Sequence, residues 1–264
     1  MDSGSKPSAF DSSNLSRLIS TPRFASFLDN ADGDKERAFK LYIWNRDLSV
    51  SFLGDMAILE VALRNAMNDT AVKSWGTHWY QSPDIALDDR SCRQLAEAWN
   101  RLPKSVRSRP NDTDVPGRLI THCMFGFWTN LLDAGDYIGK PPRKVRVNYE
   151  DTWHVFKHAF PGGRGVARDL RGKGPDEAGI DLKEPTFTRA WVHGICKSTN
   201  ELRNRVAHHE PLINGFPLSG QNRRMSAEEG YEQCRLLAHL ADRDLAVWFE
   251  NNSRVPLLLS QRPI

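Results

Sequence analysis

The stretch SVSFLGDMAILEVALRNAMND, residues 49–69, decides the class of fold. Its large apolar residues recur at spacings of one, three or four, which places them on one face of an α-helix. These residues are Phe52, Leu53, Met56, Leu59, Leu63 and Met67. Ser49 stands where a capping residue is expected, so we predict an amphipathic helix of about twenty residues that begins there.

Working outward, the neighbouring segments are also helical in pattern. A helical pattern begins at Asp34, and the spacing of apolar residues predicts further helices at residues 93–101, 119–132, 151–160 and 186–209. The last helix has a capping box, with Ser226 as the N-cap and Glu229 three positions later, and extends to about Phe249. Alternating strand patterns are scarce, so the predicted fold is all-α.

The 264 residues are enough for one folded domain. We predict a flexible N-terminal arm over residues 1–33, because its first part is rich in Ser, Asp and Pro, and one helical domain over residues 34–264. The glycine-rich segment at residues 164–185 is predicted to be a surface loop.

Composition excludes several classes of protein. Hydrophobic residues make up 39% and charged residues 26% of the chain, and the formal net charge is only +3, as in ordinary globular proteins. The four cysteines form no CxxC pair, so neither a zinc ribbon nor a redox pair is indicated, and no metal or cofactor is expected. No signal peptide and no apolar stretch of about 18 to 20 residues is visible. We therefore expect a soluble, cytoplasmic protein without a membrane partner.

The chemistry is concentrated in LRNRVAHHEP, residues 202–211. Asn204 and His208 are four positions apart and share one face of a helix, and the long side chain of Arg203 can reach the same place. A histidine can take or give a proton near neutral pH, and an arginine can stabilise the charge of a phosphoryl group. These are the groups that RNA cleavage by an internal 2′-hydroxyl needs. The alternative is structural, because a histidine at a helix end is often a solvated or capping residue.

Four stretches together resemble the Abi-like (abortive infection) family, whose members carry a HEPN domain with an Arg-x4–6-His motif. The first is the motif itself, with a polar residue, Asn204, after Arg203 and a second histidine, His209, after His208. The other three are Leu41-Tyr42-x-Trp44-Asn45, Leu59-Glu60-Val61-Ala62-Leu63-Arg64-Asn65 and Phe125-Gly126-Phe127-Trp128. The resemblance spans residues 41–214 in the family's order.

This resemblance implies a HEPN-like helical bundle with additional helices. It also implies a homodimer that brings two Arg–His motifs into one composite cleft, and a toxin-like endoribonuclease that acts in defence against phage. Some relatives work with a small non-coding RNA, so such an RNA or an antitoxin is a further expected partner. The catalytic residues would be Arg203, Asn204 and His208.

Further residues are candidates for supporting roles. Glu60 and Arg64 form either an intrahelical ion pair or, together with Asn65 and His209, a support for the Arg203–His208 pair. The segment from Lys140 to Lys173 holds nine Lys or Arg against three acids, so it is either a solvated basic surface or a track for the RNA backbone. Within the second interpretation the residues expected to bind RNA are Lys140, Arg143, Lys144, Arg146 and Arg205.

Two hypotheses from different classes remain. The first is a metal-independent endoribonuclease that cleaves RNA by 2′-hydroxyl attack at the Arg-x4-His site. The second is a non-catalytic HEPN protein that binds RNA or regulates a partner. A nucleotidyl-transfer function is disfavoured, because no transferase motif is present.

Overall fold

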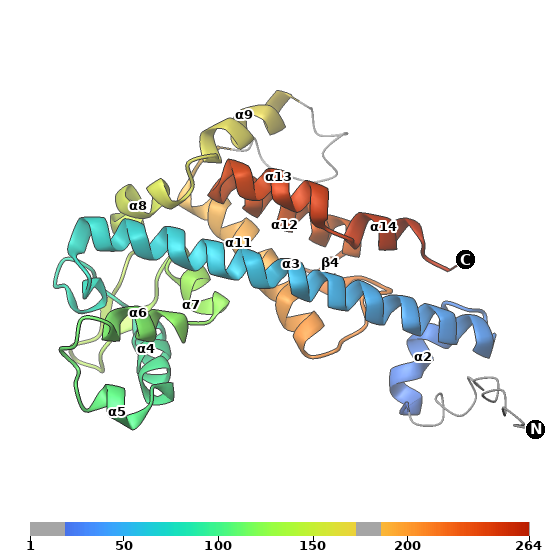
Figure 1. The fold of residues 1–264 in the computed structure, drawn as a ribbon, viewed down its shortest axis with the longest axis horizontal. Coiled ribbons are helices and arrows are strands. Elements are labelled where there is room, and N and C mark those ends of the chain that lie inside the picture. The colour runs from blue at the N-terminus through green and yellow to red at the C-terminus, as the bar shows by residue number, and fades with distance from the viewer. Residues whose placement is uncertain (1–18, 173–185, 264) are drawn as a thin grey trace, which may run out of the picture.

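The fold is all-α and is organised around one long helix (Figure 1). The computed structural model describes residues 19–172 and 186–263. The central helix α3, Lys35–Trp75, has 41 residues and is therefore about 60 Å long. The carboxylate of Asp34 caps its start by accepting hydrogen bonds from the backbone N–H groups of Glu36 and Arg37 at 2.9 and 3.1 Å. Ser49 is thus an interior residue of α3, and the prediction that a helix begins there is wrong.

One face of α3 is buried along its whole length, as the apolar spacing predicted. The buried apolar residues are Ala38, Leu41, Trp44, Leu48, Phe52, Met56, Leu59, Leu63, Met67 and Ala71. Leu53 departs from the prediction, because 44% of it is exposed to solvent. Val50, which is 64% exposed, and Val61, which is 43% exposed, are also exposed apolar residues of α3.

Other helices pack against α3 on several sides. They are α2 (Thr21–Asp29), α7 (Phe125–Asn130), α8 (Glu150–Phe156), α11 (Arg189–Ala207), α12 (Ala227–Ala241) and α14 (Val255–Ser260). In Figure 1, α2 lies beside one end of α3, and α4 (Asp89–Arg101), α5 (Lys104–Arg107) and α6 (Val115–Thr121) lie at the other. The remaining elements are α9 (Gly163–Gly172), α13 (Arg243–Asn252), the short 3-10 helices η1 (Trp79–Gln81) and η2 (Lys157–Ala159), and two hairpins. The hairpins pair β1 (Tyr137–Ile138) with β2 (Val145–Arg146) and β3 (Phe216–Pro217) with β4 (Arg224–Met225).

Several predicted helices are confirmed in position but not in length. The helix predicted at residues 119–132 is two short helices, α6 and α7, and Phe125, Phe127 and Trp128 are fully buried in the core. The capping box of α12 is present, with Ser226 and Glu229 bonded reciprocally. The apolar stripe beyond it is divided at Asp242, which ends α12 and caps α13.

Two segments predicted to lack regular structure contain helices. The predicted arm, residues 1–33, includes α2, whose Phe24 and Phe27 are buried in the core. The helical fold therefore begins before Asp34. Residues 1–18 of the predicted arm lie outside the described part of the chain. The predicted loop at residues 164–185 begins with α9, and its remainder, residues 173–185, is not described. None of the helices in residues 19–172 and 186–263 combines the length and apolarity required to cross a bilayer.

Candidate functional site

The Arg203–His208 segment forms the C-terminal end of α11. The helix ends at Ala207, and His208 is its C-cap. His209 adopts a left-handed conformation with φ 57°, and its N–H bonds to the Val206 carbonyl at 3.1 Å. The Glu210 N–H bonds to the Arg205 carbonyl at 2.9 Å, which completes a Schellman motif. The sequence predicted this end within two residues, since Pro211 disfavours continuation of the helix.

Arg203 lies at a junction of three helices. Its Nε is 3.6 Å from Oε2 of Glu60 on α3, and the two side chains are 23% and 21% exposed. Oε1 of Glu60 accepts a hydrogen bond of 3.0 Å from the backbone N–H of Phe125, the first residue of α7. The α7 N-cap, Met124, forms no side-chain capping bond, so the Glu60 carboxylate accepts from the first N–H of that helix instead. One carboxylate therefore joins α3, α7 and α11 and orients the guanidinium of Arg203.

The neighbouring polar groups extend this junction. Arg203 donates a long hydrogen bond of 3.4 Å from a terminal guanidinium nitrogen to Oδ1 of Asn204. Arg64 donates from Nε to Oδ1 of Asn65, also at 3.4 Å. Glu60 thus pairs with Arg203 rather than with Arg64. The structure therefore does not contain the intrahelical Glu60–Arg64 ion pair, which was one of the two alternatives for Glu60.

The two histidines project from the helix end in different ways. The N–H of His208 bonds to the carbonyl of Asn204 at 3.0 Å, so these residues lie one turn apart. Both imidazoles are exposed, and neither forms a hydrogen bond or an ion pair with another described residue. The backbone of His209 is held by Arg23 of α2, which donates a hydrogen bond to the His209 carbonyl.

A cleft of about 300 Å³ opens beside this helix end. Arg23, Arg46 and His209 contribute its cationic or titratable groups. Its apolar lining includes Phe27, Tyr42, Val50, Leu53, Val206 and Pro211. The two arginines were not predicted as site residues. Arg46 follows Asn45, which the resemblance already included, but Arg23 fell within the predicted arm and carried no sequence signal.

The basic residues predicted to bind RNA do not join this site. Lys140, Arg143, Lys144 and Arg146 are all exposed in or next to the β1–β2 hairpin, and Nζ of Lys144 lies 4.1 Å from the centre of the Tyr137 ring. The segment that carries the hairpin contacts the first residue of α11, since Arg189 donates to the Leu132 carbonyl at 2.6 Å. The 19 residues of α11 span about 28 Å, so hairpin and motif lie toward opposite ends of this helix.

The fifth predicted RNA-binding residue, Arg205, has a local partner. Its guanidinium lies 2.6 Å from Oε2 of Glu210, across the turn that ends α11. The two side chains are 31% and 44% exposed, so a competing phosphate has access to the pair.

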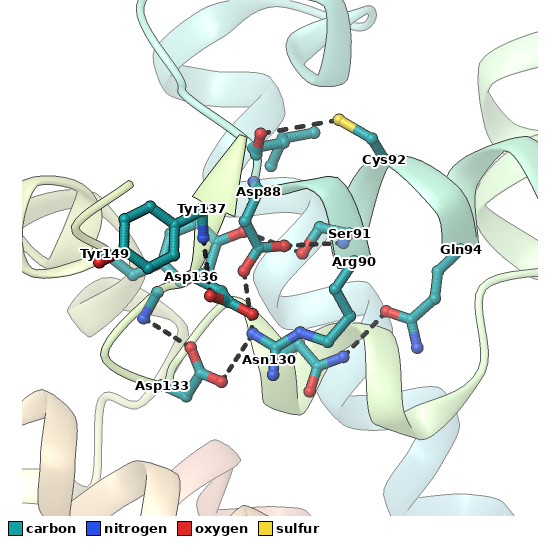
Figure 2. Close-up of polar contacts among 12 residues, drawn as sticks. Asp88, Arg90, Ser91, Cys92, Gln94, Asn130, Asp133, Asp136, Tyr137 and Tyr149 are labelled. Atoms are coloured by element: carbon teal, nitrogen blue, oxygen red, sulfur yellow. Dashed lines mark hydrogen bonds and ion pairs between the residues drawn. The ribbon is translucent and has the colours of Figure 1, made fainter. Parts of the chain in front are cut away.

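A largely buried polar cluster lies beside the β1–β2 hairpin (Figure 2). Arg90 lies between two carboxylates, 2.9 Å from Asp88 and 2.7 Å from Asp133. Asp88 is fully buried and also accepts the Ser91 N–H at 2.7 Å, while Oγ of Ser91 lies 2.9 Å from the Tyr149 hydroxyl. Burial alone would raise the pKa of Asp88, but the hydrogen bonds from Ser91 and the charge of Arg90 hold it below its ordinary value. In this cluster one guanidinium is shared by two carboxylates, and it joins α4 to the segment that follows α7.

The chemistry available at the end of α11 is therefore an oriented guanidinium, a carboxamide and two solvent-accessible imidazoles. Comparison of the chain with protein-family models, with curated proteins and with solved structures gives no match.

Proposed function

We propose that this protein is a HEPN-type endoribonuclease of the Abi-like kind, with Arg203, Asn204 and His208 as its catalytic residues. The observation that carries the proposal is the junction at Glu60, which pairs with Arg203 at the helix end that also presents the exposed imidazole of His208. A fixed cation beside an accessible acid–base group suits phosphodiester cleavage.

In the proposed reaction the 2′-hydroxyl of a nucleotide attacks the adjacent phosphorus. A new O2′–P bond forms while the P–O5′ bond breaks, an imidazole accepts the 2′-hydroxyl proton, and a second acid protonates the leaving 5′-oxygen. Arg203 stabilises the negative charge that builds on the phosphoryl oxygens, and Asn204 donates a hydrogen bond to them. The products are a 2′,3′-cyclic phosphate and a 5′-hydroxyl. DNA lacks the attacking group and is not a substrate.

The cleft beside the motif offers a path for the RNA backbone. Arg23 and Arg46 line it together with His209, so a phosphate one nucleotide away from the scissile bond would meet cationic groups there. The side chain of Arg46 pairs with Asp47 at 2.6 Å on the exposed surface, an interaction that a phosphate can replace. His209 supports binding in this scheme, and its substitution by alanine should reduce cleavage less than that of His208.

A second copy of the chain would complete the acid–base pair. One motif provides His208 as base, and a two-fold related copy provides the other as acid. Val50, Leu53 and Val61 are exposed apolar residues of α3; the first two line the cleft beside the motif, and the third follows Glu60. Exposed apolar residues grouped in this way are typical of an interaction surface.

The substitution Val61→Lys tests this homodimer. It should convert a dimer to a monomer in light scattering and reduce cleavage in proportion, without removing any positive charge that RNA needs. Val145→Lys is the matched control, because Val145 is 61% exposed in β2, in the hairpin that lies toward the opposite end of α11 from the motif. A wild-type protein that stays monomeric and cuts RNA in proportion to its concentration would refute the composite site.

A second candidate function is RNA binding without cleavage, as in a regulatory HEPN protein. The contact between Arg203 and Glu60 favours it, since a paired guanidinium has less charge to offer a transition state. Incubation of the purified protein with RNA in EDTA distinguishes the two. Cleavage that leaves cyclic or 3′-phosphate ends supports the endoribonuclease, whereas saturable binding with intact RNA supports the alternative. A strict requirement for a divalent metal with 3′-hydroxyl ends would contradict the proposed chemistry.

The biological setting is a further part of the proposal. Toxin-like growth arrest in defence against phage follows from the resemblance, and a small non-coding RNA or an antitoxin would be the partner that restrains it. Expression of the wild-type chain should arrest growth, and expression of Arg203→Ala should not.

A further inference from the structure

The exposed face of α3 carries a regular apolar seam. Its members follow one another at spacings of four, three and four residues, and all of them are exposed: Val50, Gly54, Ala57 and Val61. This alternation is the heptad spacing at which one α-helix packs along another. In Figure 1 no other element passes in front of the middle of α3. The seam is therefore open to a second helix.

The glycine of the seam has no evident role within the single chain. Gly54 lies in the interior of a helix of 41 residues, where glycine is less stable than alanine. A Cβ added at Gly54 would meet nothing within 4 Å, so no neighbour in the described chain requires a glycine there. Small residues such as Gly54 and Ala57 do allow the axis of another helix to approach to about 8 Å. The centre of the seam thus suits close packing against a helix from outside the chain.

The charges at the ends of the seam indicate which helix fits. At the same spacing Asp47 precedes the seam and Arg64 follows it. An antiparallel second copy of α3 places its Arg64 against Asp47, and brings its Glu60 toward Arg46. A parallel copy would instead place each of these end charges against its own equivalent, which is repulsive. The face of α3 is therefore complementary to itself in the antiparallel direction.

The antiparallel direction also brings the two proposed sites together. Arg46, Leu53 and Glu60 are spaced by seven residues, so they form one edge of the seam. Arg46 and Leu53 line the cleft beside the motif, and Glu60 pairs with Arg203, so the motif borders this edge. A two-fold axis perpendicular to antiparallel helices leaves this edge of both copies on the same side of the pair, whereas parallel helices place the two edges on opposite sides. The two motifs then flank the axis near Leu53.

The other edge of the seam borders a second exposed apolar region. Ile58 of this edge is 37% exposed and lines a groove of about 540 Å³ together with Gly54, Trp248 of α13 and Leu258 of α14. Trp248 is 39% exposed. A stable interface buries about 800 Å² on each partner, which is more than a narrow seam offers. A second α3 on the seam would also cover this groove, and the apolar contact would extend onto α13 and α14.

We propose that this face of α3 pairs in the antiparallel direction with the same face of a second copy of the chain, across Gly54 and Ala57. The pairing gives the proposed homodimer a defined interface and places each Arg203–His208 motif beside the other. Its role in cleavage rests on the proposed function, whereas the pairing itself can be measured without RNA.

The first test is Gly54→Leu, with the mass of the RNA-free protein followed by sedimentation and light scattering. The wild type should be a dimer, and Gly54→Leu should raise its dissociation constant about tenfold or more, because two leucines hold the helices apart. Circular dichroism should remain that of the wild type, since the new side chain has open space within the single chain. Gly117→Leu is the matched control, because Gly117 is an exposed glycine of α6 with nothing within 4 Å, and it should stay dimeric.

The second test determines direction by disulfide formation, in a Cys92→Ser background because Cys92 is the exposed cysteine of the four. The double variant Val50→Cys/Val61→Cys should form a disulfide-linked dimer on oxidation, because residue 50 of one copy lies against residue 61 of the other. Either single variant should not, because equivalent residues lie about 16 Å apart along antiparallel helices, too far for a disulfide.

The interface is refuted if the wild type is monomeric at every concentration at which it is soluble, or if folded Gly54→Leu dimerises like the wild type. Disulfide-linked dimers of both single variants would refute the antiparallel direction. A dimer that passes both tests but cuts no RNA would contradict the proposed ribonuclease and leave the interface standing.

Discussion

Removal of the Glu60 carboxylate should destabilise the protein by an amount that its two contacts predict. The hydrogen bond from the Phe125 N–H is 3.0 Å long and has a charged acceptor, and such bonds are worth about 1.5 to 3 kcal/mol. The pair with Arg203 is 3.6 Å long and about one-fifth exposed, which adds at most about 1 kcal/mol. Glu60→Ala should therefore lower the free energy of unfolding by about 2 to 4 kcal/mol. Glu60→Gln keeps an acceptor for Phe125 and should cost only about 1 kcal/mol.

The assay is reversible urea unfolding followed by circular dichroism, with thermal unfolding as a second measurement. For a chain of this size 1 kcal/mol corresponds to about 2 to 4 °C, so Glu60→Ala should lower the Tm by about 4 to 16 °C. Glu36→Ala is the control, because Glu36 is 74% exposed and pairs with Lys40 on the surface, so its loss should cost less than about 1 kcal/mol. Equal losses for Glu60→Ala and Glu60→Gln would refute the role assigned to the Phe125 bond, and no loss in either would refute the junction.

Two further predictions concern stability elsewhere. Asp55 is 6% exposed, and its burial raises its pKa although Ser253 donates a hydrogen bond of 2.6 Å to it. The folded state therefore binds this proton more tightly than the unfolded state. The stability of the wild type relative to Asp55→Asn should rise as the pH falls through the folded-state pKa and level off below about pH 4, as urea unfolding across a pH series will measure. A pH-independent difference would contradict this. Gly162→Ala should be strongly destabilising, since the new Cβ would overlap the His239 carbonyl oxygen. Gly165→Ala places its Cβ where no atom lies within 4 Å and should stabilise α9 by up to about 1 kcal/mol. Equal melting temperatures for the two variants would contradict this packing.

Local signals in the sequence predicted the helices well. The capping box of Ser226 and Glu229 lies within one turn, and its geometry is as predicted. The end of α11 follows from Pro211, another local constraint. The length of α3 was underestimated because Ser49 has the chemistry of a cap, whereas the uninterrupted run from Asp34 to Gly76 has no residue that stops a helix. Propensity at one residue was overridden by packing along the whole helix.

Contacts between distant segments could not be predicted in the same way. The pairing of Glu60 with Arg203 depends on how α3 and α11 cross, which no local pattern specifies. The intrahelical partner Arg64 has ideal spacing for Glu60, yet the buried N-terminus of α7 draws this carboxylate away from it. The β1–β2 hairpin shows the same limit. The basic side chains of Lys140 and its neighbours suit RNA binding as the motif does, but they lie toward the opposite end of α11 from it.

The most direct test of the central proposal uses one DNA oligonucleotide that contains a single ribonucleotide, in EDTA. The wild-type protein should cut it only after the ribonucleotide and leave a 2′,3′-cyclic phosphate, because only that position has an attacking hydroxyl. Arg203→Ala and His208→Ala, each shown by circular dichroism to be folded, should leave it intact. Cleavage by either folded variant at the wild-type rate, or cleavage of the same oligonucleotide without its 2′-hydroxyl, would contradict the account.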